Sequence, residues 1–378
     1  MQNELVKDCL KLGFGLMRLP RVNGEKGMYA KIDIEATKRM VDEFMAAGGR
    51  YFDTAFVYQG SEEAAREALC SRYPRESYYL ATKLNAAPFA CKSEAEAKAQ
   101  LTTSLERTGA GYIDFYLLHG LGEGNLAQYE KFGIWEFAQE AKRQGLVRHV
   151  GFSFHDSPEL LDRILTDHPE AEFVQLQINY ADWEDKDVLS RGCYEVATRH
   201  GVPVVVMEPV KGGLLADPPE SVREVLRGAD PNASPAAWAL RFAASLSNVM
   251  IVLSGMSNEE QMQENLSVMK DFKQLTPEEE AVVDRAREAL LKVDRIPCTG
   301  CHYCTPGCPA GIHIPEIFSI VNGYRTYRNL GMAKHDYGWR HGGAPASSCV
   351  QCGQCENACP QHLPIISLLA ETASLLED

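Results

Sequence analysis

The sequence of 378 residues has little that would place it in a membrane or on a nucleic acid. No run of about 18 apolar residues occurs, which excludes a membrane-spanning helix. The first residues lack a basic stretch followed by an apolar one, so we expect no targeting segment and a cytoplasmic protein. Acidic residues also outnumber basic ones. The formal net charge is −14, which disfavours nucleic acid and acidic membrane surfaces as partners.

A glycine-rich dinucleotide fingerprint is missing as well. Gly13 and Gly15 lie in a predicted opening strand within residues 10–20, but Arg18 stands where the third glycine is required. The phosphate loop that usually opens a doubly wound parallel sheet is therefore absent. This absence disfavours an open sheet as the fold.

Apolar runs and helical stretches alternate along the first three quarters of the chain. After the opening strand, further strands are predicted at 51–55, 78–83, 113–118, 147–152, 173–178, 203–207 and 249–253. The last two runs are apolar on both faces, as in a parallel sheet that helices cover. Eight strand-helix units in about 290 residues predict an α/β fold, a (β/α)₈ TIM barrel over residues 1–292.

Four reactive side chains stand at or just after the ends of three successive predicted strands, namely Asp53, Tyr58, Lys83 and His119. The carboxyl ends of barrel strands meet at one rim, where barrel enzymes have their sites. A lysine ammonium lowers the pKa of a nearby tyrosine from about 10, a carboxylate holds the ammonium, and an imidazole can orient a carbonyl. Singly, each residue is more simply a structural hydrogen-bonding group. Together they suit protonation of a carbonyl oxygen while hydride reaches the carbon.

Residues 10–270 resemble the aldo-keto reductase family. The segments that carry the resemblance are Tyr51-Phe-Asp-Thr-Ala-Phe-Val-Tyr58, Ala81-Thr-Lys83 and Asp114-Phe-Tyr-Leu-Leu-His119. The resemblance implies a barrel that binds NADP(H) or NAD(H) without a Rossmann fold and reduces a small-molecule carbonyl substrate. It also implies that Tyr58 is the general acid, assisted by Lys83 and Asp53, and that His119 orients the substrate.

The same resemblance implies contacts to the nicotinamide end of the cofactor. Ser153 and Gln175 match residues that hold the carboxamide, although Phe154 replaces an asparagine beside Ser153. Met207 stands where many members have an aromatic residue that stacks on the nicotinamide. A polarizable thioether can also pack on a ring.

At the other end of the cofactor, Glu264 and Asn265 match the family's adenosine-binding pair. Ser257 followed by Glu260 fits a capping box, which predicts a helix start whose free N–H groups face a phosphate. Two positions where many members carry basic residues for the 2′-phosphate are here Gly255 and Gln261. NADP and NAD therefore both stay open.

Twelve cysteines are present, and their placement argues against disulfides. Cys9, Cys70, Cys91 and Cys193 are scattered, whereas eight crowd into residues 298–359. In a cytosolic chain such crowding is more typical of metal binding than of disulfides.

The eight clustered cysteines form two copies of one pattern, each followed by proline: Cys298, Cys301, Cys304, Cys308, and then Cys349, Cys352, Cys355, Cys359. This is the spacing of the bacterial two-cluster ferredoxins, in which the fourth cysteine of a run ligates the other cluster. We therefore expect two [4Fe-4S] clusters. One would be held by Cys298, Cys301, Cys304 and Cys359, and the other by Cys349, Cys352, Cys355 and Cys308. Zinc is the alternative for paired cysteines, and the repeated run argues against it.

The segment 293–378 is predicted to be helical. Residues 314–328 place Ile317, Ile320, Val321 and Tyr324 on one side of a helix, and residues 365–376 form another. This resembles the all-helical two-cluster ferredoxin fold, so we expect a small helical dicluster domain after the barrel.

Three functions are compatible with these sites. The first is an NAD(P)H-dependent oxidoreductase that reduces an aldehyde or ketone to an alcohol and carries two clusters. The second is an electron-transfer oxidoreductase, in which the clusters exchange single electrons with the barrel site or with an electron-transfer protein. A flavin would normally mediate between hydride and single-electron chemistry, but no separate flavin domain is indicated. The third is a non-catalytic nicotinamide redox sensor, which the complete set of reactive residues disfavours.

Overall fold

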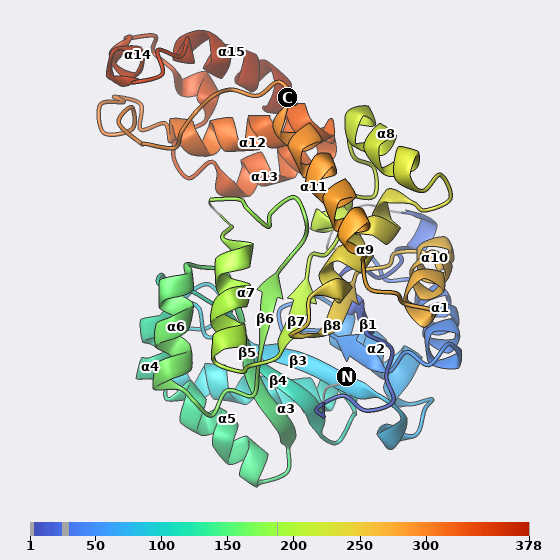
Figure 1. Ribbon diagram of the computed structural model, residues 1–378. Helices are drawn as coiled ribbons and strands as arrows, with labels where there is room; N and C mark the ends of the chain where they lie inside the picture. Colours follow the sequence, from blue (N-terminus) through green and yellow to red (C-terminus); the bar gives the residue numbers. More distant parts are fainter. Residues whose placement is uncertain (1–3, 25–29, 187, 378) are drawn as a thin grey trace. The chain divides into compact units, whose positions relative to one another are not determined.

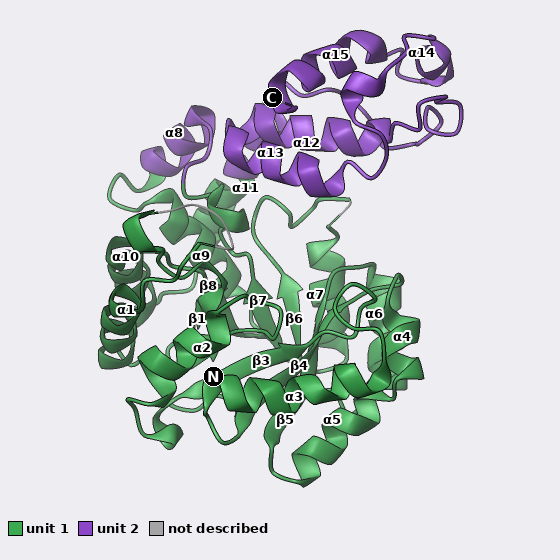
Figure 2. Cartoon of the chain, turned by 180° about the vertical axis from the view of Figure 1, so that it is seen from behind, with its two compact units in different colours: residues 1–216, 229–284 green, residues 217–228, 285–378 purple. Residues whose placement is uncertain are grey.

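The computed structural model describes residues 4–24, 30–186 and 188–377. The chain divides into two compact units (Figure 1, Figure 2). The first unit comprises residues 1–216 and 229–284, and the second comprises residues 217–228 and 285–378. The domain boundary that we placed after residue 292 stays a prediction.

The first unit contains a closed barrel of eight parallel strands in sequence order, in which β1 pairs with both β2 and β8. The strands are β1 (Leu12–Gly15), β2 (Tyr51–Asp53), β3 (Tyr79–Leu84), β4 (Ile113–Leu121), β5 (Val147–Phe154), β6 (Phe173–Gln177), β7 (Val204–Met207) and β8 (Val249–Ser254). Figure 1 shows helices packed around the outside of these strands. The predicted TIM-like barrel is confirmed.

Helices follow the strands along the chain. They are α1 (Ile34–Ala46), α2 (Ser61–Ala65), α3 (Glu94–Thr108), α4 (Leu126–Lys131), α5 (Ile134–Arg143), α6 (Pro158–Asp167), α7 (Ser190–Arg199), α8 (Glu220–Ala229), α9 (Pro235–Ser245), α10 (Glu259–Lys270) and α11 (Pro277–Leu291). Between β2 and β3, α2 continues into a π-helical turn, Arg66–Cys70.

Alternation along the strands places the reactive side chains directly above an apolar plug inside the barrel. Tyr51, Phe115 and Phe173 belong to one buried cluster, and each is followed two or four residues later by a polar residue of the predicted site. Because residues two apart share a face of a strand, Asp53 and Gln175 point into the same interior one layer higher. The plug closes the barrel below the site.

The second unit is helical. Besides α8 and the end of α11, it contains α12 (Ile314–Tyr327), α13 (Leu330–Arg340), α14 (Gln354–Ala358) and α15 (Ile365–Leu376), of which α13 and α14 were not predicted. Ile317, Ile320 and Val321 are buried in its core as expected, and Tyr324 packs against that core. The buried amide of Asn322 on α12 accepts from the N–H of Ile296 at 2.7 Å and donates to its carbonyl at 2.9 Å. This pair of bonds fixes the chain two residues before Cys298.

In the described part of the chain, no helix combines the length and the apolar character that crossing a membrane requires.

An ionic cluster at the amino-terminal end of the barrel joins β5 to the start of β6. The carboxylate of Glu172 lies 2.8 Å from Nδ1 of His149 and 2.6 Å from Nζ of Lys142, and accepts from the N–H of Val150 at 3.0 Å. Burial alone would raise the pKa of Glu172, but these bonds outweigh burial and lower the pKa from its ordinary 4.5 to about 2. The charged form of Glu172 therefore stabilises the folded barrel.

We predict that Glu172→Gln lowers the free energy of unfolding by about 1–3 kcal/mol near neutral pH, since it removes a charged acceptor. A carboxylate whose pKa is lowered on folding stabilises above its unfolded pKa, and this contribution disappears as the pH falls toward its folded pKa. The difference between wild type and variant should therefore shrink as the pH falls from about 5 to about 3, as measured by urea unfolding. The exposed Glu130→Gln variant is the control. An equal difference at both pH values would contradict the prediction.

Candidate active site and candidate cluster sites

The structure brings Asp53, Tyr58, Lys83 and His119 together at the carboxyl ends of β2, β3 and β4. Lys83 is 1% exposed and Asp53 is 4% exposed, so both charges are removed from water. Nζ of Lys83 lies 2.6 Å from Oδ1 of Asp53 and donates to the carbonyl of Thr54 at 2.7 Å. Two oxygen acceptors therefore hold this ammonium in one position.

Tyr58 lies between Lys83 and His119. Nζ of Lys83 is 5.0 Å from the centroid of the Tyr58 ring. The Tyr58 and His119 rings meet edge to face, with centroids 5.7 Å apart and an interplanar angle of 84°. The phenol, the ammonium and the imidazole thus face one small region of the rim.

The electrostatics of Tyr58 differ from the expectation. Burial raises the pKa of Tyr58 above its ordinary 10, and the charge of Lys83 opposes this rise without cancelling it. The predicted net lowering of this pKa is therefore wrong, because the sequence shows the neighbouring ammonium but does not show how completely the phenol is removed from water. Tyr58 stays a neutral phenol with a proton to donate.

Lys83 and His119 have opposite protonation states. Burial would lower the pKa of Lys83, but Asp53 and Tyr58 outweigh burial and raise it, so Lys83 remains an ammonium. Burial, aided by the charge of Lys83, lowers the pKa of His119 from 6.5 to about 3, so this imidazole is neutral near pH 7. Its Nδ1 is buried and has no hydrogen-bond partner among the described residues.

The residues predicted to contact a nicotinamide lie on three later strands of the same barrel. Ser153 on β5 is buried, and its hydroxyl accepts from the N–H of Gly120 at 2.7 Å. The side-chain amide of Gln175 on β6 donates to Oδ2 of Asp53 at 3.2 Å, which ties this glutamine to the reactive set. Met207 ends β7 and is half-buried.

The residues predicted for the adenosine end lie on α10. Asn265 is buried, and its amide donates to the hydroxyl of Ser254 at 2.9 Å, whereas Glu264 is half-buried and Gln261 is exposed. The predicted cap at Ser257 is wrong. Asn258 is the N-cap, and its side chain accepts from the N–H of Gln261 at 2.9 Å. The helix starts one residue later because the Ser257 hydroxyl is used elsewhere: it donates to the carbonyl of Arg18 at 2.7 Å.

A further rim network was not foreseen from the sequence. The buried carboxylate of Asp182 accepts from the amides of Gln177 at 2.9 Å and Asn179 at 2.7 Å, and forms an ion pair with Lys211. Glu208 and Lys211 both have positive φ angles, of 54° and 48°. The Asp182 pair therefore anchors an unusual backbone directly after Met207. The only sequence signal was the pair of glycines at 212 and 213, which marks a tight loop.

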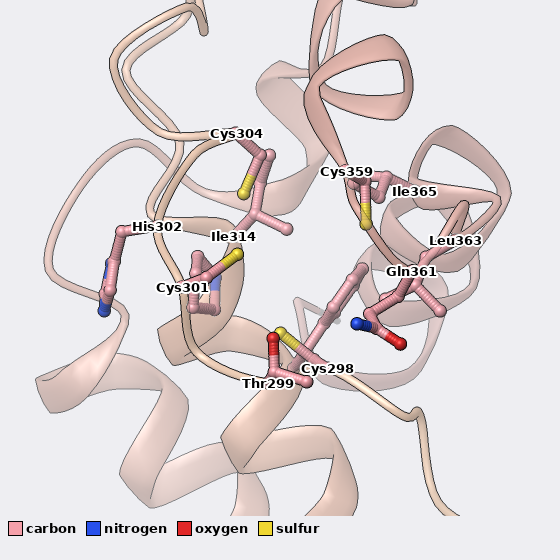
Figure 3. A pocket seen from close by; sticks show the side chains of 12 residues that line it. Cys298, Thr299, Cys301, His302, Cys304, Ile314, Cys359, Gln361, Leu363 and Ile365 are labelled. Atoms are coloured by element: carbon pink, nitrogen blue, oxygen red, sulfur yellow. The ribbon is translucent and has the colours of Figure 1, made fainter.

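The eight clustered cysteines line two separate cavities in the second unit. Cys298, Cys301, Cys304 and Cys359 line a cavity with about 330 Å³ free of protein atoms. Figure 3 shows the four sulfur atoms of this set pointing into one common space. Cys308, Cys349, Cys352 and Cys355 line a second cavity, with about 310 Å³ free of protein atoms. In each cavity the fourth cysteine comes from the other run, as the spacing predicts.

The two cysteine runs have the same local geometry. The third cysteine of each run, Cys304 or Cys355, is buried, and the second, Cys301 or Cys352, is exposed. Left-handed residues flank the second cysteine in both runs: Gly300 and His302 in the first, Gln351 and Gly353 in the second. This pair of turns curls each run around its cavity. Among the described residues, no three His, Cys, Asp or Glu side chains lie close enough together to bind one single metal ion.

Comparison with known proteins identifies both parts of the chain. Residues 11–288 match the family model of the aldo/keto reductase family, and residues 297–363 match that of a 4Fe-4S dicluster domain. An aldo-keto reductase of Mycobacterium avium is 31% identical over 248 residues, which are 64% of this chain and 79% of that protein. An aldo-keto reductase of Strobilurus tenacellus is 30% identical over 54% of this chain, which spans 59% of that protein's length.

Solved structures agree with this result. The holo form of an aldo-keto reductase from Bacillus halodurans superposes with a TM-score of 0.58 at 25% identity, covering 73% of this chain and 91% of that one. An aldo-keto reductase from Klebsiella pneumoniae in complex with NADPH has a TM-score of 0.57 at 19% identity, covering 73% and 90%, and so shares the fold. The chain belongs to the aldo/keto reductase family and carries a C-terminal 4Fe-4S dicluster domain.

Proposed function

We propose that the barrel reduces a small aldehyde or ketone to an alcohol with NADPH or NADH, and that the C-terminal domain holds two [4Fe-4S] clusters. The reaction belongs to residues 1–292 and the clusters to residues 293–378. The observation that carries the reductase proposal is the buried ion pair between Lys83 and Asp53 beside a neutral Tyr58.

Each reactive side chain has a role that follows from its protonation state. Tyr58 keeps its proton at neutral pH and can give it to a carbonyl oxygen. The Lys83 ammonium then stabilises the phenolate that remains, and Asp53 and the Thr54 carbonyl keep that ammonium in place. Neutral His119 can donate a hydrogen bond to the same oxygen and orient the substrate. The nicotinamide, when bound, supplies the hydride.

The cofactor would lie along the rim from β5 to α10. Ser153 and Gln175 would hold the carboxamide, and Met207 would pack against the ring. Ser257, Gln261, Glu264 and Asn265 would hold the adenosine end. The donor set suits this use because buried amides and hydroxyls face the rim beside Tyr58. The proposed roles of these residues do not require a flavin.

Two cavities, each lined by four cysteines, support the cluster proposal. A [4Fe-4S] cluster takes one thiolate at each iron, and four sulfurs spread around a cavity provide that arrangement. The cluster, when bound, supplies a one-electron redox centre. The N–H of Ile312 donates to Sγ of Cys308 at 3.4 Å. Bonds of this kind tune the potential of a cluster.

Electron exchange with a partner protein is the second candidate function. It is favoured by the exposure of Cys301 and Cys352, because ligands at the surface bring cluster edges within reach of a partner. EPR after addition of an electron donor, either NADPH alone or the alcohol alone, tests whether the clusters accept electrons, separately from carbonyl reduction; clusters that stay oxidised with both donors would contradict this function. A nicotinamide sensor without turnover is the remaining alternative, and it is distinguished by the next experiment.

We predict that Tyr58→Phe lowers kcat for NADPH-dependent reduction by about 10²–10⁴-fold, as loss of a general acid does, while the Kd for NADPH stays close to that of wild type. The assay uses anaerobically purified full-length protein and a panel of aliphatic and aromatic aldehydes and ketones. Tyr116→Phe is the matched control, since it removes another buried phenol hydroxyl that has no partner among the described residues. Undiminished activity in Tyr58→Phe would end the reductase proposal. Cofactor binding without turnover by wild type would favour the sensor.

The crossed pairing of cysteines predicts different iron contents for two double variants. Cys298→Ala with Cys359→Ala removes two ligands of one cluster and should leave about half of the iron, because the other cavity keeps all four thiolates. Cys298→Ala with Cys308→Ala damages both clusters and should lose most of the iron. Iron analysis and EPR after anaerobic reconstitution measure both. The reverse ranking would mean that each run of four holds its own cluster.

A further inference from the structure

The segment that would face the adenosine end of the cofactor carries no positive charge. Residues 255–265 contain no lysine or arginine, and α10 begins with Glu259 and Glu260. Gln261 is already engaged, because its Oε1 accepts from the N–H of Ser257 at 2.8 Å. Two carboxylates on the first turn would repel a phosphate. A cation from elsewhere in the chain is needed if this rim is to bind a second phosphate group.

The side chain of Arg18 packs against Gly255, which belongs to this segment. If Gly255 carried a Cβ, that atom would be 3.4–3.6 Å from three carbons of the Arg18 side chain. Nη1 of Arg18 donates to the carbonyl of Gly212 at 3.4 Å, and the carbonyl of Arg18 accepts from the Ser257 hydroxyl. The arginine therefore contacts the loops that follow β7 and β8. Because residue 255 is a glycine, the aliphatic part of the Arg18 side chain has room to lie there.

The guanidinium of Arg18 has no carboxylate partner among the described residues. Two other cations near these loops are already neutralised. Arg39 pairs with Glu259 at 2.5 Å, and Lys211 pairs with Asp182. A guanidinium is always charged and presents a fork of donors that matches phosphate oxygens. Arg18 is exposed, so an incoming anion can reach it.

We propose that Arg18 binds the 2′-phosphate of NADP(H) and gives the barrel its preference for NADPH over NADH. The inference rests on the proposed reductase function and deepens it. The charge that residues 255 and 261 do not provide comes instead from the loop after β1. Arg18 acts in cofactor selection and takes no part in the chemical step.

The test is the Kd of the full-length protein for NADPH and for NADH, measured by fluorescence titration under anaerobic conditions. Arg18→Met should raise the Kd for NADPH by about 10–100-fold, as loss of a charged hydrogen bond does, and leave the Kd for NADH within about threefold. Arg18→Lys should fall between wild type and Arg18→Met. Added salt should weaken NADPH binding more in wild type than in Arg18→Met, because an exposed ion pair is screened.

The double variant Arg39→Ala with Glu259→Gln is the matched control, since it removes a positive charge near the same helix together with the carboxylate that neutralises it. An equal rise of both Kd values in Arg18→Met would place the contact at the pyrophosphate or the fold and overturn the proposal. An unchanged Kd for NADPH in Arg18→Met, or an equal rise of that Kd in the double control variant, would also overturn it. Wild type that binds neither nucleotide would instead refute the proposed function itself.

Discussion

The candidate active site depends on one buried charge, the ammonium of Lys83. Removing an ammonium from water costs several kcal/mol unless partners replace its hydration. Asp53 and the Thr54 carbonyl are those partners, and both come from the strand and turn adjacent to β3. The barrel thus has to close β2 against β3 in the observed register before this charge is tolerated. The same register places Tyr58 beside the ammonium.

The protonation states of the neighbours follow from that arrangement. A phenol that is removed from water holds its proton more tightly, whereas a buried imidazole next to an ammonium is kept neutral. Tyr58 and His119 can therefore both act as hydrogen-bond donors at neutral pH, although their ordinary pKa values differ widely. Burial is the main cause of both shifts, and the charge of Lys83 adds to the shift of His119 and opposes that of Tyr58.

The sequence was most informative where a periodic apolar pattern ends in a chemically reactive side chain. Apolar runs that end in Asp53, Lys83 and His119 predicted both the barrel and the meeting of these side chains, because parallel strand ends share a rim. The cysteine spacing likewise predicted which four sulfurs surround each cavity. Local pattern could not choose between Ser257 and Asn258 as a cap, since both residue types cap helices well. The net pKa direction of Tyr58 also escaped prediction, because burial depends on the packed barrel.

Contacts between residues far apart in the sequence were also not predicted. Arg18 and Ser257 are 239 residues apart, and no sequence spacing indicates that they meet. The Asp182 and Lys211 pair and the helix α13 were missed for a related reason. Their places are set by loops and tertiary packing, and their own sequences have weak periodicity. Sites assembled from loop residues at the rim are thus the least accessible to reasoning from sequence.

The crossed arrangement of the cysteines has a mechanical consequence. Cys359 lines the cavity of the first run, and Cys308 lines the cavity of the second run. Two bound clusters would therefore link the two runs to each other at two places. Because the entropy of closing a loop depends only weakly on its length, either fastening alone still confines most of the chain between the runs. If oxidation destroyed one cluster, the remaining cluster would still hold the two runs together. The four cysteines of the vacant site would then stay close enough to bind a new cluster.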